Sequence, residues 1–180
     1  MTKRIGVLIG SLRKDSYSRK IANYLANALS ENYEISFIEL AQLSIYNPNM
    51  DNDADLPVSW QELRQNVLAV DALLFVTPEY NRSIPAVLKN ALDIASRPMG
   101  KNAWGGKPGA IVSISPGNIG GFGANHHLRQ VAACLNMVMM PSPETYLGNI
   151  AAAIDAEGTV NDAMQQILSK FLTAFTAWIE

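Results

Sequence analysis

The sequence predicts an α/β fold in which helices cover both faces of a parallel sheet, the doubly wound arrangement. Two observations lead to this class. Short apolar runs alternate five times with segments whose apolar residues recur at helical spacing along the 180 residues. Most of these runs are apolar throughout, which is typical of parallel strands buried on both faces. Repeated strand–helix units of this kind join through right-handed crossovers into one sheet.

The five expected strands lie at residues 5–10, 34–40, 72–77, 109–114 and 137–140. The second alternates polar and apolar residues, so we expect it near an edge of the sheet. The usual order for five strands in this architecture is 2-1-3-4-5, the flavodoxin-like order, and ligands bind beyond the carboxyl ends of the strands where that order reverses. Function is therefore expected in the loops after the first, third and fourth strands.

A helix is expected after each strand, at about residues 19–31, 59–70, 85–95, 128–135 and 164–178. Ser59 and Glu62 have the spacing of a capping box at the start of the second helix. Pro85 lies at the expected start of the third. The loop at 41–58 is rich in Asn, Asp and Pro and exceeds the usual connection length, which favours a lid or a contact with a partner.

Composition and charge narrow the class of protein. The length favours one domain spanning residues 1–180. Fourteen basic and sixteen acidic residues give a net charge of −2, so neither nucleic acid nor a membrane surface is an expected partner. The sequence contains no signal-peptide pattern and no apolar stretch of the ~20 residues that a membrane span needs. Cys134 is the only cysteine and is expected on a buried helix face. We therefore expect a cytoplasmic protein.

The first loop, residues 10–18, carries hydroxyl groups and a guanidinium at the N-terminus of a helix. Its candidate phosphate ligands are Ser11, Arg13, Ser16 and Ser18. Free N–H groups and the helix dipole attract an anion there, and an arginine binds phosphate in bidentate fashion. The loop suits a terminal monophosphate, because it lacks both the dinucleotide fingerprint and the Walker motif. The alternative is that Ser16 and Ser18 only cap the helix.

The second and third loops are candidates for binding a heteroaromatic ring. The second, residues 77–85, holds Glu79, Tyr80 and Asn81 between two prolines, so its rigid backbone could present N–H groups to a ring edge. The third, residues 115–123, has four glycines in seven residues, which permits close approach of backbone to a ligand. The alternatives are an ordinary proline-containing turn and a flexible turn.

Metal and nucleophile chemistry are not indicated. His126 and His127 are the only histidines, and adjacent helical residues point in different directions. Neither histidine has the further ligands of a zinc site. The sequence contains no nucleophile-elbow serine, and Cys134 lacks a phosphatase signature. We therefore expect no metal and no catalytic side chain, with the chemistry carried by a bound cofactor.

At these loops the sequence resembles the NADPH-dependent FMN reductase family, and in particular its quinone and chromate reductase branch. The motif G-S-x-R-x-x-S lies at residues 10–16, and P-E-Y-N-x-S-x-P-x-x-L-K-N-x-L-D is complete at residues 78–93. Ser115, Gly117 and the run His-Leu-Arg-Gln at residues 127–130 look like that branch. The resemblance covers about residues 4–150.

The resemblance implies a fold, a cofactor and a reaction. Hydride would pass from NADPH or NADH through bound FMN to quinones or similar small acceptors, which include free FMN, chromate and azo compounds. The phosphate of FMN would be held by Ser11, Arg13, Ser16 and Ser18. The isoalloxazine ring would be lined by Pro78, Glu79, Tyr80 and Asn81, with Ser115 and Gly117 at its other edge. The alternative is a flavodoxin-like electron carrier, or an FMN-binding redox sensor, without NAD(P)H turnover. Carriers of that kind are typically strongly acidic, and −2 fits them poorly.

The resemblance also implies a homodimer or homotetramer with the flavin near a subunit interface. Tyr80, Arg129 and Glu144 occupy positions that the family associates with contacts between subunits. Two departures stand out in the first loop. Asp15 replaces a small residue and adds a negative charge near the expected phosphate, and Tyr17 with Ser18 replaces a pair that often contains asparagine.

Overall fold

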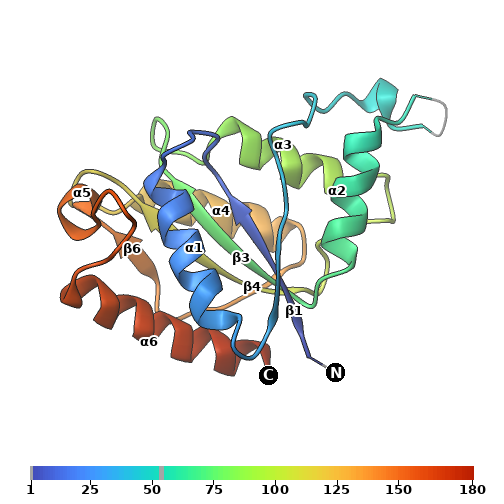
Figure 1. The fold of residues 1–180 in the computed structure, drawn as a ribbon. Coiled ribbons are helices and arrows are strands. Elements are labelled where there is room, and N and C mark those ends of the chain that lie inside the picture. Colours follow the sequence, from blue (N-terminus) through green and yellow to red (C-terminus); the bar gives the residue numbers. More distant parts are fainter. Residues whose placement is uncertain (1, 53–54) are drawn as a thin grey trace.

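A parallel sheet with helices on both faces forms the centre of the molecule (Figure 1). The structure is a computed structural model that describes residues 2–52 and 55–180. Its strands are β1 (Arg4–Ile9), β2 (Glu34–Phe37), β3 (Ala72–Pro78), β4 (Pro108–Ile114), β5 (Val138–Met139) and β6 (Thr145–Leu147). They lie in the order β2-β1-β3-β4-β5, and β6 also pairs with β4. The predicted fold class and strand order are therefore confirmed, with a sixth strand added.

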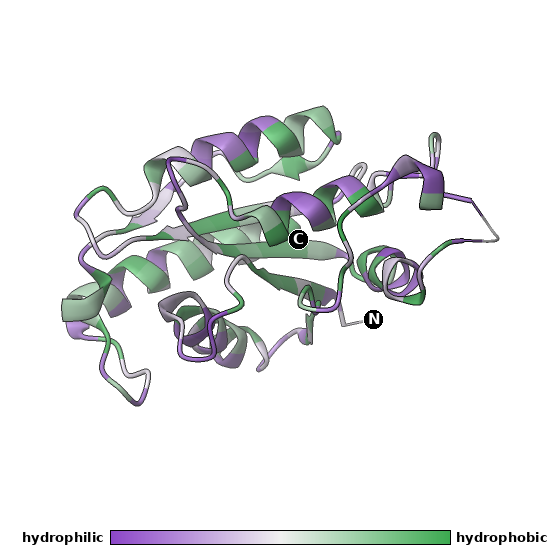
Figure 2. Ribbon diagram, turned by 90° about the horizontal axis from the view of Figure 1, so that it is seen from above, coloured by the Kyte–Doolittle hydropathy of each residue, from purple (hydrophilic) through white to green (hydrophobic). Residues whose placement is uncertain are grey.

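Helices cover the two faces of the sheet unequally. They are α1 (Tyr17–Leu29), the 3₁₀ helix η1 (Pro48–Met50), α2 (Val58–Leu68), α3 (Ala86–Ala95), α4 (Phe122–Cys134), α5 (Ile150–Ala153) and α6 (Asp162–Ile179). Buried residues of α1 and α6 share one core with the sheet, and those of α2, α3 and α4 share the other. Figure 2 shows the hydrophobic strands between these two layers.

Both faces of the central strands are buried. In β1, Val7 and Ile9 face the core on the α1 and α6 side, whereas Leu8 between them faces the core on the other side. Because successive side chains of a strand point to opposite faces, a strand covered on both sides is apolar at most positions. This is why the strands read as continuous apolar runs in the sequence.

The expected fifth strand, residues 137–140, is instead two short strands along the same edge of β4. Val138 and Met139 of β5 pair with Pro108 and Gly109. Farther along β4, Thr145 of β6 pairs with Val112. Pro141 and Pro143 lie between the two strands. Proline has no N–H group to donate to a neighbouring strand, so a continuous ladder cannot form there.

Three local predictions differ from the structure. Helix α2 begins at Val58 after Pro57 without a side-chain cap, so the expected capping box of Ser59 and Glu62 does not form. Helix α4 begins at Phe122, within the stretch expected to be a glycine-rich loop. Cys134 is exposed, and its expected burial is wrong, because Ala132 occupies the buried side of this helical turn.

The long loop at 41–58 lies against its own chain where the structure describes it; residues 53 and 54 lie outside the description. Asn90 of α3 accepts a hydrogen bond from the backbone N–H of Tyr46 at 2.8 Å and donates to the carbonyl of Ser44 at 2.9 Å. Arg64 of α2 pairs with Asp51 at 2.6 Å. Near the two ends of the described chain, Lys3 donates a hydrogen bond to the carbonyl of Ile179. Among the described helices, none combines the length and apolarity that a lipid bilayer would require.

Candidate functional site

The predicted loops meet around a cavity of about 230 Å³ beyond the carboxyl ends of β1, β3 and β4. The strand order reverses between β1 and β3, which is where ligands bind in open α/β sheets. The lining residues are Ser11, Arg13, Ser16, Tyr17, Ser18, Pro78, Glu79, Tyr80, Ile114, Ser115, Pro116 and Ile150.

Eight of the ten predicted site residues line this cavity. The exceptions are Asn81 and Gly117, which lie in the loops but outside the lining. Sequence reasoning missed four lining residues: Tyr17, Ile114, Pro116 and Ile150. Three of these flank predicted residues directly and could have been included by position. Ile150 comes from the short helix α5, which no sequence pattern indicated.

The first loop has free hydrogen-bond donors beside the cavity. Ser16 is the N-cap of α1, where its hydroxyl accepts from the N–H of Arg19 at 3.1 Å. The capping alternative therefore holds for Ser16. Ser18 is only 2% exposed, and its hydroxyl has no hydrogen-bond partner among the residues that the structure describes. Arg13 is exposed and forms no ion pair within the described part of the chain.

The loop reaches the cavity by passing directly over β3. The N–H of Gly10 donates to the carbonyl of Val76 at 2.9 Å. A Cβ atom at this position would clash with the hydroxyl of Thr77. Only glycine permits this close approach, which brings the first loop and the second loop against the same cavity.

The second loop contains a tight turn that directs Asn81 outward. Tyr80 and Ser83 exchange two backbone hydrogen bonds of 3.0 Å each. Between them Asn81 and Arg82 both have positive φ, at 50° and 67°. This is the conformation of a type I′ turn, which Asn tolerates well and Arg does not. Asn81 is therefore exposed at the tip of the turn, whereas Tyr80, 47% exposed, stands at the rim of the cavity.

The carboxylate of Glu79 is engaged by α4 rather than left free for a ligand. Its Oε2 accepts from the N–H of Ala124 at 3.1 Å, in the first turn of α4. Arg82 lies 3.6 Å from the other oxygen. A Cβ atom on Gly123 would come within 2.9 Å of Glu79 Oε2, so this glycine is needed for the contact. A negative charge at a helix N-terminus is stabilising. Glu79 thus fastens the second loop to α4.

The third loop is held by its own serine. The hydroxyl of Ser115 donates to the carbonyl of Gly117 at 2.8 Å and accepts from the N–H of Gly120 at 3.1 Å. The carbonyl of Gly117 also accepts from the N–H of Asn149 at 2.9 Å. The single proton of Ser115 is therefore used within the loop. The loop is thus tied together by its own hydrogen bonds and by the contact with Asn149.

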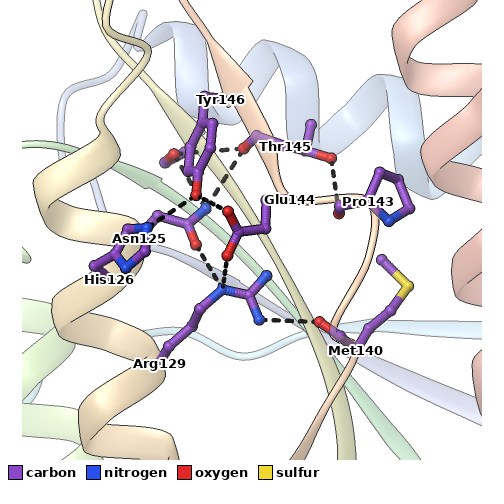
Figure 3. A network of polar contacts seen from close by, with 9 residues as sticks. Asn125, His126, Arg129, Met140, Pro143, Glu144, Thr145 and Tyr146 are labelled. Carbon is purple, nitrogen blue, oxygen red and sulfur yellow. Dashed lines mark hydrogen bonds and ion pairs between the residues drawn. The ribbon is translucent and has the colours of Figure 1, made fainter.

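A polar network lies behind the third loop (Figure 3). Arg129 of α4 lies 3.5 Å from Glu144, and the hydroxyl of Tyr146 donates to the other oxygen of that carboxylate. Burial and, after it, the hydrogen bond and negative charge of Glu144 raise the pKa of Tyr146 to about 12. Arg129 and Glu144 thus pair within one chain, whereas Tyr80 lies apart at the cavity rim.

These features fit the phosphate and ring of a flavin mononucleotide. The N-terminus of α1 offers the first N–H groups of a helix, which have no partner within the helix. Beside them lie the unpartnered hydroxyl of Ser18 and the guanidinium of Arg13, both suited to a phosphate dianion. The two other loops line the same cavity through Pro78, Glu79, Tyr80, Ser115 and Pro116 and could contact a planar ring there.

Comparison with known proteins places the chain in a family. The family model of NADPH-dependent FMN reductase matches residues 3–152. The chain belongs to this family. The resemblance seen in the loop motifs is therefore confirmed, and with it the assignment as an oxidoreductase that uses FMN and a nicotinamide electron donor.

Known proteins and a solved structure match nearly the whole chain. A quinone reductase from Pseudomonas putida is 45% identical over 176 residues, 98% of this chain and 94% of its own. A 2-hydroxy-1,4-benzoquinone reductase from Burkholderia sp. is 43% identical over 180 residues, covering 99% and 97%. The structure of FerB, a flavoenzyme NAD(P)H:(acceptor) oxidoreductase from Paracoccus denitrificans, superposes with a TM-score of 0.92 at 38% identity, covering 99% and 97%.

Proposed function

We propose that this chain is an NAD(P)H-dependent quinone reductase whose FMN is bound in the cavity between the three loops. The observation that carries the proposal is the convergence of eight predicted site residues on one cavity at the reversal of strand order. Names of relatives at 43–45% identity support quinones as the acceptor class. Free FMN, chromate and azo compounds are further candidate acceptors.

The phosphate of FMN is proposed to lie at the N-terminus of α1. Arg13 would bind it in bidentate fashion, since its guanidinium is exposed and without an ion pair among the described residues. The hydroxyls of Ser11 and Ser18 and the helix N–H groups would complete the shell. Ser16 lines the cavity but already caps α1, so its contribution would be to orient the helix.

The isoalloxazine ring is proposed to lie between the second and third loops. Pro78, Glu79 and Tyr80 would contact it from one side. Ser115 would contact it from the other, together with the backbone next to Gly117. Asn81 reaches a ligand only from the tip of its turn, so its role would be to permit the turn. Ordered N–H groups near the ring would stabilise negative charge that develops there.

Bound FMN supplies the redox chemistry, accepting hydride from NAD(P)H and passing electrons to the acceptor. The chain then needs to bind, orient and shield rather than to act as a base. Tyr80 at the rim would pack against whichever planar molecule stands at the cavity mouth. One open face would serve nicotinamide and acceptor in turn, which agrees with a broad range of small oxidants.

Three further properties are part of the proposal. The chain acts as one domain over residues 1–180, it works in the cytoplasm, and it assembles as a homodimer or homotetramer. An exposed Tyr80 beside the cavity supports the last point, because a second subunit there would cover the rim and complete the site. Measuring the KM for NADH and the KM for NADPH would show which of the two donors the protein prefers.

One experiment separates this function from its alternatives. Protein saturated with FMN is mixed with NADPH and, separately, with NADH in the absence of oxygen, and flavin absorbance is followed; a quinone panel is then added at fixed donor concentration. We expect rapid bleaching followed by reoxidation that depends on the quinone. A flavodoxin-like carrier or an FMN-binding redox sensor would keep its oxidised spectrum with both donors, and that result would overturn the proposed function.

The cofactor has its own test. Protein purified after addition of both FMN and FAD is denatured, and the released flavin is identified by chromatography. We expect FMN, because the first loop offers a monophosphate site and no second phosphate site. Recovery of FAD alone would contradict the assignment of the cavity.

A further inference from the structure

We propose that Asn125, a buried residue of α4, positions the third loop of the flavin site. This inference rests on the proposed function, since it concerns the same cavity. Asn125 does not line the cavity and belongs to none of the sequence motifs. It is fully buried, and so is Ser113 of β4, with which it is hydrogen-bonded. Buried polar side chains are costly unless each has a partner, so their contacts show what they hold in place.

The contacts form a chain of hydrogen bonds that runs one way. Arg129 Nε donates to Asn125 Oδ1 at 3.0 Å, and Asn125 Nδ2 donates to Ser113 Oγ at 3.2 Å. Ser113 Oγ in turn donates to the carbonyl of Gly120 at 2.8 Å. Gly120 lies in the third loop, and its N–H continues the chain to Ser115.

Arg129, at the outer end of this series of hydrogen bonds, fixes the direction in which each bond is donated. A guanidinium only donates, so the amide of Asn125 must turn its oxygen toward Arg129 and its nitrogen toward Ser113. Ser113 has one proton, and it therefore accepts from Asn125 and donates to Gly120. Reversal at any one residue would leave two donors or two acceptors facing each other. Ser113 Oγ also lies 3.4 Å from the carbonyl of Thr145, but its shorter contact, at 2.8 Å, is to Gly120. These hydrogen bonds therefore tie the Gly120 carbonyl to Ser113.

The backbone of Gly120 leaves the third loop little room to shift. Its φ is +66°, and its backbone packs so tightly on Tyr146 that a Cβ atom would lie 2.6 Å from the Tyr146 carbonyl carbon. The loop therefore rests on β6 on one side and on Ser113 beneath it. Asn125 Nδ2 also lies 3.5 Å from the carbonyl of Thr145, in β6 itself. The amide of Asn125 thus contacts both Ser113 and β6, the two parts of the protein on which the third loop packs.

Asn125→Asp tests the proposal with a change of one atom. A carboxylate still accepts from Arg129 but cannot donate to Ser113, so only the inner half of the chain breaks. We expect FMN to bind about tenfold more weakly, the effect of one or two lost hydrogen bonds. Riboflavin affinity should fall by a similar factor, because the third loop contacts the ring and not the phosphate. Both are measured by quenching of flavin fluorescence.

Asn90→Asp is the matched control. Asn90 is also buried and also accepts one hydrogen bond and donates another, in its case with backbone groups as both partners. It holds the loop at residues 41–58, which is not part of the cavity lining. Both variants should lose stability toward urea in the absence of flavin. Only Asn125→Asp should lose flavin affinity. Equal flavin binding by the two variants would overturn the positioning role, whether both bind normally or both bind weakly.

Ser113→Ala provides a second variant if Asn125→Asp fails to fold. It removes the next link with little change of volume and should weaken FMN and riboflavin alike. In the double variant the loss should not exceed that of either single variant, because both break the same chain. Additive losses would contradict the proposal. Wild-type protein that does not bind FMN would instead refute the proposed function.

Discussion

The first and third loops border the same cavity but are built in opposite ways. The first loop leaves its groups free: Arg13 is exposed, and the hydroxyl of Ser18 has no partner within the described residues. The third loop leaves little free, because Ser115, Gly117 and Gly120 are already hydrogen-bonded to one another or to neighbouring segments. The phosphate end would therefore gain its contacts on binding, whereas the groups at the ring end are already hydrogen-bonded within the protein.

This division has an energetic reason. A phosphate dianion forms strong charge-assisted hydrogen bonds, and these can offset the ordering of an exposed arginine. A neutral ring edge offers weaker contacts, which contribute to affinity only where the protein loses little entropy on binding. Changes in the third loop should therefore alter folding and ring binding together. Changes in the first loop should alter phosphate binding alone.

The largest effect is expected for Gly120→Ala. The added methyl group would lie 2.6 Å from the carbonyl carbon of Tyr146, and the residue would have to keep a φ of +66°. Overpacking and backbone strain together predict a loss of about 2–4 kcal/mol in the free energy of unfolding. Gly117→Ala is the control within the same loop, because the nearest atom to its added Cβ is Ser115 Oγ at 4.0 Å. Urea unfolding measures the free energy of unfolding of both variants. Similar values for Gly120→Ala and Gly117→Ala would show that the third loop is not held at Gly120.

A smaller effect, confined to the ligand, is expected for Arg13→Ala. The loss of a charged hydrogen-bond donor predicts FMN binding weaker by about 1.5–3 kcal/mol. Riboflavin, which has no phosphate, should bind as before, and stability toward urea should not change. Lys14→Ala, a neighbouring cation outside the cavity lining, controls for net charge. Isothermal titration with both ligands gives the comparison, and equal losses for FMN and riboflavin would show that Arg13 acts through folding.

Breaking the Arg129–Glu144 ion pair should lower the stability of the protein by an intermediate amount. A fully buried charged pair would cost about 3–5 kcal/mol to break. Here the side chain of Glu144 is 39% exposed, so solvent screens it and Glu144→Ala should cost about 1 kcal/mol of chain stability. Because the family resemblance associates Glu144 with subunit contacts, the same variant should also weaken assembly. Sedimentation at matched concentrations, with NADPH oxidation measured alongside, tests this; a fully active wild-type monomer would end the interface argument.

The contact between Tyr146 and Glu144 can be tested by the pH at which Tyr146 loses its proton. Its pKa is raised to about 12 by burial first and by Glu144 second. A raised pKa in the folded state stabilises the protein below pH 10, and that stabilisation is lost as the pH rises through 12. In Glu144→Gln the pKa of Tyr146 should fall toward 10, while burial keeps it above the ordinary value. The difference in tyrosinate absorbance between each protein and its Tyr146→Phe counterpart measures the shift; an unchanged titration would show that Glu144 does not contact Tyr146.

The sequence predicted those parts of the fold that repeat a pattern. Continuous apolar runs identified the strands because burial on both faces leaves few polar positions, such as Thr77 in β3 and Ser113 in β4. The three residues of β6 and the four of α5 are too short to show a period, so β6 and the cavity residue Ile150 were missed. Helix α4 was expected to start too late, because the glycines at its start are typical of a loop. The contact of Glu79 with the N–H of Ala124 in the first turn is visible only in the folded chain.

For the site, too, the sequence indicated the residues that belong to a recognisable pattern. Motif residues next to strand ends were found, since the carboxyl ends of parallel strands converge. Asn81 was expected in the cavity because it lies in a motif, but positive φ at two successive residues turns it outward. Ser113 and Asn125 gave no signal, because a buried polar pair is defined only by its partners in the folded chain.

The smallest effect is expected for Asp15→Asn, which tests the open character of the first loop. Asp15 is exposed and does not line the cavity, although it directly precedes Ser16 at the N-cap of α1. Its charge therefore acts on a bound phosphate only through solvent, where salt screens it. Removing it should strengthen FMN binding by about 0.3 kcal/mol at low salt, the lower range for a charge near a helix terminus. The gain should vanish at about 1 M salt, where the screening length is about 3 Å.

Titration of FMN at two salt concentrations measures this effect, with riboflavin as the ligand that should not respond. A loss of affinity in Asp15→Asn would mean that Asp15 orders the first loop through a contact, as the residues of the third loop do. The two ends of the cavity would then be built alike. A gain that depends on salt would show that the phosphate end relies on free charge and the ring end on fixed geometry.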